Sequence, residues 1–254
     1  MAAVEDEMWF YRALHAHLEG ELATGLTDGR GVPGSHLADS EADGRIRILD
    51  AGCGTGGLIR RTEARHADWT WTGVDVEPIA VELARSRCKA EIVQASLLEL
   101  PFEDARFDAV VCSDVLYHLD DDAGAVTELG RVLRPDGLLV INVPAHRWLW
   151  SYHDVTVHGR RRYVRDDVRE LLQTAGFRTE RITHWNALPL PLVVARRKLL
   201  PPPRSGSDVC LYPAPIEAAF RTGAALERWW LRTIGTLPFG SSILARARKP
   251  ASLP

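Results

Sequence analysis

Short apolar runs alternate with stretches of helical period along most of the chain. The runs at 45–50, 70–75, 91–95, 107–113, 137–143 and 177–185 have the length and composition of buried strands. Between two of them, apolar residues recur every three or four positions, at Ala123, Val126, Leu129 and Leu133, which predicts a helix with one apolar face. The alternation predicts an α/β fold, with a Rossmann-like, mostly parallel sheet of seven strands and helices on both faces.

Two segments lie outside this alternation. Residues 4–22 have helical period, and a loop rich in Gly, Asp and Ser, 24–44, connects them to the first strand. Residues 187–238 contain three consecutive prolines and a helical stretch, 216–234, and have the length of a lid. A seventh strand, 241–247, then returns to the sheet edge.

This organisation predicts one domain over residues 1–254. Within it, 1–44 form an N-terminal helix and loop, and 187–238 form an inserted helical lid or cap before the last strand.

The amino-acid composition limits which binding partners and which cellular location are expected. Thirty-one Lys and Arg against 34 Asp and Glu give a net charge of −3, which disfavours nonspecific nucleic-acid binding. The first residues are acidic where a signal peptide needs positive charge. The longest stretch without charged residues, 182–195, contains two prolines and is too short to span a bilayer. We expect a cytoplasmic protein without a transmembrane segment, and the sequence does not indicate its oligomeric state.

The strongest local motif is ILDAGCGTGG at 48–57, where a buried strand enters a glycine turn and then a helix. Glycines let the backbone approach a ligand closely, and the helix start offers free N–H groups to an anion. Gly52, Gly54 and Gly57 also satisfy the pattern G-x-G-x-x-G, with Asp75 about 20 residues further on, as in nicotinamide-binding folds. The motif predicts a cofactor that contains adenosine.

Five motifs together resemble the class I S-adenosylmethionine-dependent methyltransferases. The glycine turn is similar to their first motif, GVDVEP at 73–78 to the acidic end of their second strand, and SLLELPF at 96–102 to their third-strand loop. The stretches 107–119 and 133–144 are similar to their fourth and fifth strands. The resemblance implies that the cofactor is S-adenosylmethionine.

The resemblance also implies roles in cofactor binding. Asp50 would face the α-ammonium group, Asp75 would accept both ribose hydroxyls, and the glycine turn would face the methionine carboxylate. Ser96 stands where the family usually has Asp beside the adenine, next to the N–H of Leu97. For the two acids, capping of a helix or turn is the alternative. The predicted cofactor-binding residues are Asp50, Gly52, Cys53, Gly54, Gly56, Asp75, Val76, Ser96, Leu97, Ser113 and His118.

The segment 146–163 resembles the part of small-molecule methyltransferases, including those acting on quinone precursors and natural products, where a His-Asp pair follows strand five. Histidine suits a general base at neutral pH. We predict His153 as the base, with Asp154 orienting it and His158 in reserve, and a loop-capping His-Asp pair is the alternative. The spacing of these residues does not indicate a metal site.

Aromatic residues are candidates for contact with the acceptor. We predict Trp9, Tyr11, Tyr117 and His146 as substrate-contacting residues, against the alternative that they pack in the core. The run 160–162 of three arginines reads as a solvated face unless the acceptor is anionic.

The insertion 187–238 has its own charge balance. Its basic residues, Arg196, Arg197, Lys198, Arg204, Arg221, Arg228 and Arg232, outnumber its acids, Asp208, Glu217 and Glu227. Together with its apolar residues, this favours an amphiphilic acceptor or contact with an anionic membrane surface, and a solvated basic face is the alternative.

The predicted function is methyl transfer from S-adenosylmethionine to an oxygen nucleophile of a small aromatic, natural-product or amphiphilic acceptor. Two alternatives stay open. One is a nicotinamide-dependent oxidoreductase, and the other is a methyltransferase fold that binds S-adenosylmethionine without methyl transfer.

Overall fold

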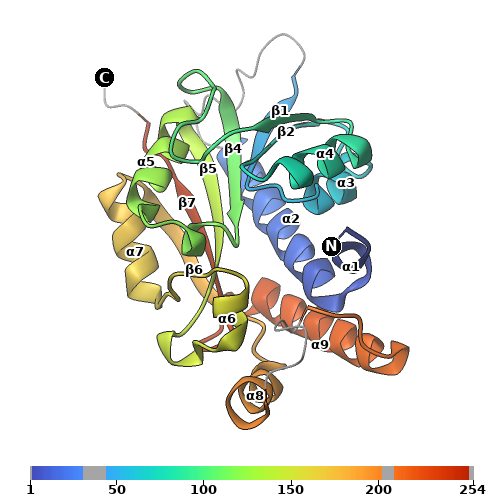
Figure 1. The fold of residues 1–254 in the computed structure, drawn as a ribbon. Coiled ribbons are helices and arrows are strands. Elements are labelled where there is room, and N and C mark those ends of the chain that lie inside the picture. Colours follow the sequence, from blue (N-terminus) through green and yellow to red (C-terminus); the bar gives the residue numbers. More distant parts are fainter. Residues whose placement is uncertain (1, 31–43, 202–208, 252–254) are drawn as a thin grey trace.

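A seven-stranded sheet forms the centre of the computed structural model, which describes residues 2–30, 44–201 and 209–251 (Figure 1). The strand order is β3-β2-β1-β4-β5-β7-β6, and β7 runs antiparallel to β5 and β6. The strands are β1 (Ile46–Ala51), β2 (Trp69–Asp75), β3 (Glu91–Gln94), β4 (Phe107–Ser113), β5 (Leu133–Pro144), β6 (Arg178–Trp185) and β7 (Ser242–Arg248). The prediction of a mostly parallel, seven-stranded α/β fold is confirmed.

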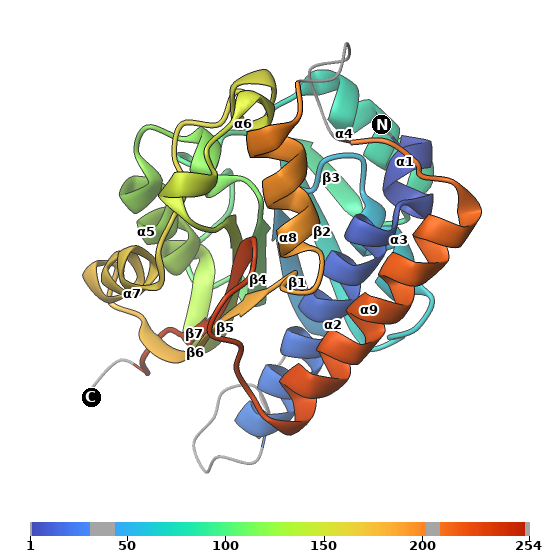
Figure 2. The same ribbon diagram turned by 90° about the horizontal axis from the view of Figure 1, so that it is seen from below.

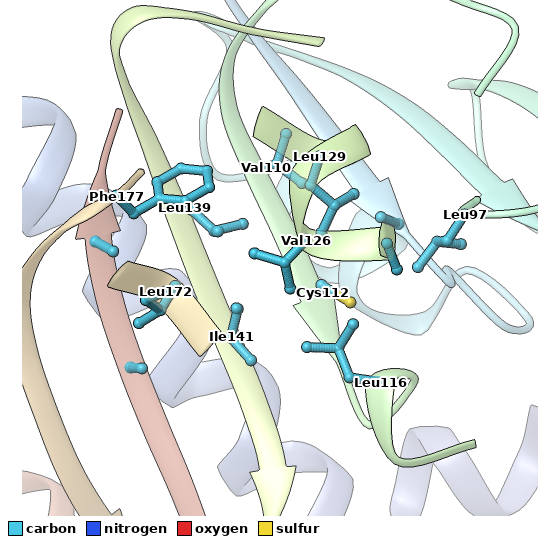
Figure 3. Packing of buried hydrophobic residues seen from close by; sticks show 14 of the residues in the cluster. Leu97, Val110, Cys112, Leu116, Val126, Leu129, Leu139, Ile141, Leu172 and Phe177 are labelled. Carbon is cyan, nitrogen blue, oxygen red and sulfur yellow. The ribbon is translucent and has the colours of Figure 1, made fainter. Parts of the chain in front are cut away.

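The central strands are buried on both faces, which explains their nearly continuous apolar sequences. In β4, Val110 and Cys112 join one hydrophobic cluster, whereas Ala109 and Val111 join the cluster on the opposite face. Figure 3 shows the first cluster, where side chains of the strands, with Leu139 among them, meet those of the covering helices.

Helices cover both faces of the sheet (Figures 1 and 2). The helices α5 (Asp122–Val132) and α7 (Arg165–Thr174) supply apolar side chains to the first cluster. The helices α2 (Trp9–Arg30), α3 (Gly57–Glu63) and α4 (Pro78–Arg87) pack on the other face.

The insertion packs on the side of the second face, against α2. It contains α8 (Leu190–Val194), a π-helical turn (Ala195–Leu199) and α9 (Ala214–Thr233), and α9 lies along α2 (Figure 2). Two buried carboxylates fasten α9. Glu217 accepts a hydrogen bond of 2.9 Å from the backbone N–H of Trp9, and Glu227 accepts from the backbone N–H groups of residues 186–188. Leu231 completes the attachment in the second cluster.

Two predicted boundaries are wrong. The N-terminal helix is divided into α1 (Ala2–Glu7) and α2, and α2 continues to Arg30 through the start of the predicted loop. It continues because Leu26 is buried, while the hydroxyls of Thr24 and Thr27 donate to carbonyls one turn earlier. The rest of that loop, 31–43, lies outside the described residues. Strand β5 begins at Leu133 rather than at residue 137, because Leu133 pairs with Phe107 of β4.

In the described part of the chain, no helix is both long enough and apolar enough to cross a bilayer. Cys53, Cys88, Cys112 and Cys210 are all free thiols.

Candidate active site

A cavity of about 1230 Å³ opens at the carboxyl ends of β1, β2 and β4. Parallel sheets place ligand sites at this edge, where the strand order reverses between β1 and β4. Its wall runs from the glycine turn, through α1 and α2, to helices α8 and α9 of the insertion. One continuous space therefore adjoins both the predicted cofactor residues and the predicted acceptor residues.

The turn after β1 needs glycine at two positions. Gly52 has φ +91°, and a Cβ there would lie 2.1 Å from Cγ2 of Val115. Gly56 has φ +79°, and its Cβ would lie 2.5 Å from Sγ of Cys88. Gly52 lies on the cavity wall, whereas Gly56 packs against α4 and does not. Gly56 therefore shapes the turn from behind the cavity wall.

Asp75 ends β2 and fixes the same turn. Its Oδ2 accepts a hydrogen bond of 2.8 Å from the N–H of Gly54, and its Oδ1 accepts one of 2.9 Å from the N–H of Glu77. A carboxylate offers about four lone-pair sites, so two remain for hydroxyl donors in the cavity. Val76, Ser96 and Leu97 continue the wall on this side.

Asp50 is a buried acid on the cavity wall, 3% exposed. Burial raises its pKa to about 8, with smaller contributions from the charges of Glu5 and Asp75. The carboxyl is therefore poised to ionise when a cation enters the cavity. Nearby on the wall, Oγ of Ser113 is buried without a hydrogen-bond partner among the described residues.

The carboxylate of a side chain of the protein itself, Glu5, lies at the N-terminal end of α3. Glu5 of α1 lies against Gly57, accepts from the hydroxyl of Thr55, and accepts a 3.3 Å hydrogen bond from Nη1 of Arg87. The sequence predicted that a ligand carboxylate would face this helix start. The structure places the side chain of Glu5 there.

On the acceptor side, His153 lies on the cavity wall. It belongs to the short helix α6 (Tyr152–Thr156), whose cap is Ser151. Asp154 also reaches the wall, but both of its carboxylate oxygens are used within the segment: Oδ2 accepts from the N–H of Ser151 at 2.8 Å, and Oδ1 accepts from Nε of Arg162 at 2.7 Å. Asp154 therefore fixes the segment that carries His153.

The interpretation of residues 160–162 as a solvated run is wrong for Arg162, whereas the side chain of Arg160 is 53% exposed. Arg162 is 5% exposed, lines the cavity and donates to the carbonyl of Ala145 at 2.9 Å as well as to Asp154. Arg160 and Arg161 pair with Asp120 and Asp122. All three guanidinium groups are therefore ion-paired, and that of Arg162 lies on the cavity wall.

Two predicted histidines are not on the cavity wall. His146 has φ +64° and stacks on His184, with ring centroids 5.0 Å apart. His158 has φ +56°, and its carbonyl lies 3.2 Å from Nδ1 of His118. His118 does line the cavity, and burial lowers its pKa, which keeps it neutral near pH 7.

The predicted aromatic residues Trp9, Tyr11 and Tyr117 all line the cavity. Burial raises the pKa of Tyr11 to about 12, with contributions from the charges of Asp114 and Glu5, and burial also raises the pKa of Tyr117. Both phenols therefore stay protonated and can donate hydrogen bonds into the cavity.

Sequence reasoning missed Asp114, which directly follows β4, at the same edge of the sheet where Asp75 ends β2. Asp114 lines the cavity in the left-handed backbone region, at φ +53°. Its Oδ1 accepts a 2.9 Å hydrogen bond from Asn142, whose Oδ1 accepts from Nε1 of Trp185 at 2.7 Å. Burial raises the pKa of Asp114 to about 7. The sequence could have indicated Asp114 as a site residue, because it is an acidic residue at the carboxyl end of a predicted parallel strand.

The strand order, the glycine turn after β1 and the acid at the end of β2 together define a class I methyltransferase fold. Residues 49–141 match the family described as "Methyltransferase domain". An O-methyltransferase of Aspergillus nomiae is 32% identical over 151 residues, which are 54% of this chain and 66% of that protein. A Mycobacterium tuberculosis protein, named a probable S-adenosylmethionine-dependent methyltransferase, is 37% identical over 135 residues, 51% of this chain and 48% of the relative.

A third relative, the ubiquinone biosynthesis O-methyltransferase of Alkalilimnicola ehrlichii, is 35% identical over 102 residues, covering 38% of this chain and 40% of the relative. The chain thus spans between two fifths and two thirds of the length of these relatives.

Solved structures share the fold. The Haemonchus contortus phosphoethanolamine N-methyltransferase 2, in complex with S-adenosylmethionine, aligns with a TM-score of 0.55 at 18% identity, over 81% of this chain and 49% of the other. The [4+2]-cyclase SpnF aligns with a TM-score of 0.54 at 22% identity, over 85% and 79%. The chain belongs to the class I S-adenosylmethionine-dependent methyltransferases.

The residues of the cavity fit that cofactor. The buried carboxyl of Asp50 suits an ammonium group, and Asp75 has lone pairs left for two hydroxyls. The buried hydroxyl of Ser113 has no hydrogen-bond partner among the described residues and can bind a polar group of the cofactor. Among the residues that the structure describes, no three His, Cys, Asp or Glu side chains gather in a metal-binding arrangement.

Proposed function

We propose that the protein transfers a methyl group from S-adenosylmethionine to an oxygen nucleophile of a small, amphiphilic acceptor. The observation that carries the proposal is the single cavity that joins the glycine turn to His153, over a separation of about 100 residues in the chain. The Aspergillus and Alkalilimnicola relatives are both named O-methyltransferases, which supports oxygen as the acceptor atom.

The lid supports an amphiphilic acceptor. Its residues on the cavity wall are apolar at Leu192, Val193, Ile216 and Phe220 and cationic at Arg196 and Arg197. An acceptor with an aliphatic or aromatic body and an anionic or polar end would match both kinds of surface.

S-adenosylmethionine, when bound, supplies an electrophilic methyl group on a sulfonium sulfur. The chain then has three tasks: Asp50 and Asp75 hold the cofactor, the lid excludes water and positions the acceptor, and His153 removes the hydroxyl proton. Asp154 and Arg162 keep α6 in place, so that the imidazole of His153 stays on the cavity wall.

Turnover with a panel of phenols and carboxylic acids, followed by release of S-adenosylhomocysteine, tests the proposal. A positioned base typically contributes about 10²–10⁴-fold, so His153→Ala should lose about that much turnover with nearly unchanged cofactor affinity. In the wild type, turnover should fall as the pH drops below the imidazole pKa, and this limb should vanish in the variant. His158→Ala, off the cavity wall, is the matched control and should retain most activity.

If His153→Ala keeps its activity and its pH profile, His153 is not the base. If the wild type binds S-adenosylmethionine but releases no S-adenosylhomocysteine with any acceptor, the alternative of a fold used without methyl transfer gains. Tight binding of NADH in place of S-adenosylmethionine would favour the oxidoreductase.

A further inference from the structure

The outer side of α9 carries a stripe of exposed apolar side chains. Leu226, Trp229, Trp230 and Ile234 are between 44% and 62% exposed. Leu226 is three and four positions before the adjacent Trp229 and Trp230, and Ile234 is four positions after Trp230, so the four side chains share a broad exposed sector, while Glu217, Glu227 and Leu231 are buried. Figures 1 and 2 both show α9 at the edge of the molecule, with α2 on its inner side.

A row of arginines runs along the flank of α9 that is turned toward α2 and borders the stripe at Trp229; a Cβ at Gly20 of α2 would lie 3.8 Å from Nη2 of Arg232. Arg221, Arg228 and Arg232 are seven and four positions apart and therefore share a side of α9. None of them has a carboxylate within 4.0 Å among the described residues, whereas Arg131, Arg162 and Arg248 elsewhere are ion-paired. Because both acids of α9 are buried, all the charge that α9 exposes is positive.

The positive surface continues onto α2 and α3. The pKa of Arg61 on α3 is lowered, mainly by burial and then by the charges of Arg65, Arg12 and Arg228, against the opposing charge of Glu19. Glu19 is already held at 3.0 Å by both Arg65 and His66. Arg12, Arg61 and Arg228 therefore lie near one another where α2, α3 and α9 meet, with Glu19 beside them.

We propose that α9, through its exposed apolar stripe and the arginine row on its flank, binds the surface of an anionic phospholipid bilayer. Helices that lie in the interface have this pattern, with Trp and Leu entering the acyl boundary and arginines reaching the phosphates. Tryptophan is favoured at that depth because its ring is apolar and its N–H needs a polar partner.

Charge complementarity distinguishes a bilayer from a protein groove. The unpaired arginines line one side of α9 without acids between them, and a uniformly anionic surface can meet all of them at once. The first half of α9 lines the cavity through Ile216 and Phe220, so docking would place the lid against the membrane. The inference does not depend on the proposed methyl transfer, because binding to lipid is measured without acceptor or turnover.

Flotation with phosphatidylcholine vesicles, with and without phosphatidylglycerol, tests the proposal on the whole protein. We expect binding to the anionic vesicles only, weaker at high salt, with a blue shift of tryptophan fluorescence. Arg228→Gln with Arg232→Gln should weaken binding roughly 5-fold per arginine, or ~25-fold together. Trp229→Ser with Trp230→Ser should weaken it by at least about tenfold.

Matched variants control for charge and for the fold. Arg106→Gln with Arg169→Gln changes the net charge equally, at partly exposed arginines of β4's start and α7, and should bind vesicles as the wild type does. Trp148→Ser removes a tryptophan that is 54% exposed outside α9 and should also bind normally. Unchanged thermal unfolding and cofactor affinity would show that the α9 variants are folded.

Three results would overturn the proposal. They are absence of binding to anionic vesicles at low salt, equal binding of the wild type and the double arginine variant, and a wild-type dimer that Trp229→Ser with Trp230→Ser converts to a monomer. The last result would assign the face to a second copy of the chain.

Discussion

Replacing Asp154 by Asn separates a structural role for this residue from a catalytic one. The carboxylate of Asp154, 1% exposed, pairs with Arg162, 5% exposed, through a 2.7 Å contact between Oδ1 and Nε. Asn keeps the shape of the side chain and can still accept from the N–H of Ser151, but it leaves a buried guanidinium without its counter-charge.

The magnitude follows from that burial. Breaking a buried ion pair by removing one partner typically costs about 3–5 kcal/mol, much of it the desolvation of the charge that is left. A single domain has about 5–15 kcal/mol of folding free energy in total, so the variant should unfold at a clearly lower urea concentration. Asp154→Asn combined with Arg162→Gln removes both charges and should recover a large part of the loss.

Urea unfolding followed by far-ultraviolet circular dichroism measures the free energy, and turnover at saturating substrates is measured in parallel at low temperature. We expect a large loss of stability, with the pH limb of His153 retained at its wild-type position. A variant as stable as the wild type whose pH limb has moved would refute the reasoning, because Asp154 would then act on the imidazole.

Three further variants probe the cofactor side and the lid. Because burial raises the pKa of Asp50 from 3.8 to about 8, the free energy of unfolding of the apo protein should fall as the pH rises from about 4 to about 8. Asp50→Asn should remove this pH dependence, which would be seen as a higher melting temperature than that of the wild type at pH 8. The same variant should bind S-adenosylmethionine more weakly. A flat wild-type profile would contradict this assignment. Asp75→Ala should weaken cofactor binding at least about tenfold by calorimetry, and wild-type affinity would remove Asp75 from the site. Glu227→Ala leaves the buried N–H groups of residues 186–188 without acceptors, which should lower the free energy of unfolding by about 1–3 kcal/mol. The amide hydrogens of these residues should then exchange faster with solvent. Unchanged amide protection would show that other contacts hold the insertion in place.

The sheet could be predicted from the sequence because strands buried on both faces have unbroken apolar runs. The turn after β1 could be predicted because Gly52 has a positive φ that other residues rarely adopt. Helix ends were harder to predict. Residues 24–28 look like a loop by composition, and only docking of Leu26 against the sheet shows why the helix continues.

The acceptor side could be predicted only in part, because its residues depend on partners far away in the chain. Arg162 reads as solvated until Asp154 and the carbonyl of Ala145 are seen to bury it. Asp114 gains its raised pKa from burial and its fixed position from Asn142, neither of which is visible in the local sequence.

The position of β7 within the sheet affects how the protein folds during its own translation. Strand β6 hydrogen-bonds to the sheet only through β7, which is the last strand of the described chain to be synthesised. While residues 186–241 leave the ribosome, the free edge of β5 and the whole of β6 stay unpaired, and such edges are templates for aggregation. The nascent chain is therefore most exposed to misassembly late in translation, and conditions that slow synthesis of the lid should lower the yield of folded protein.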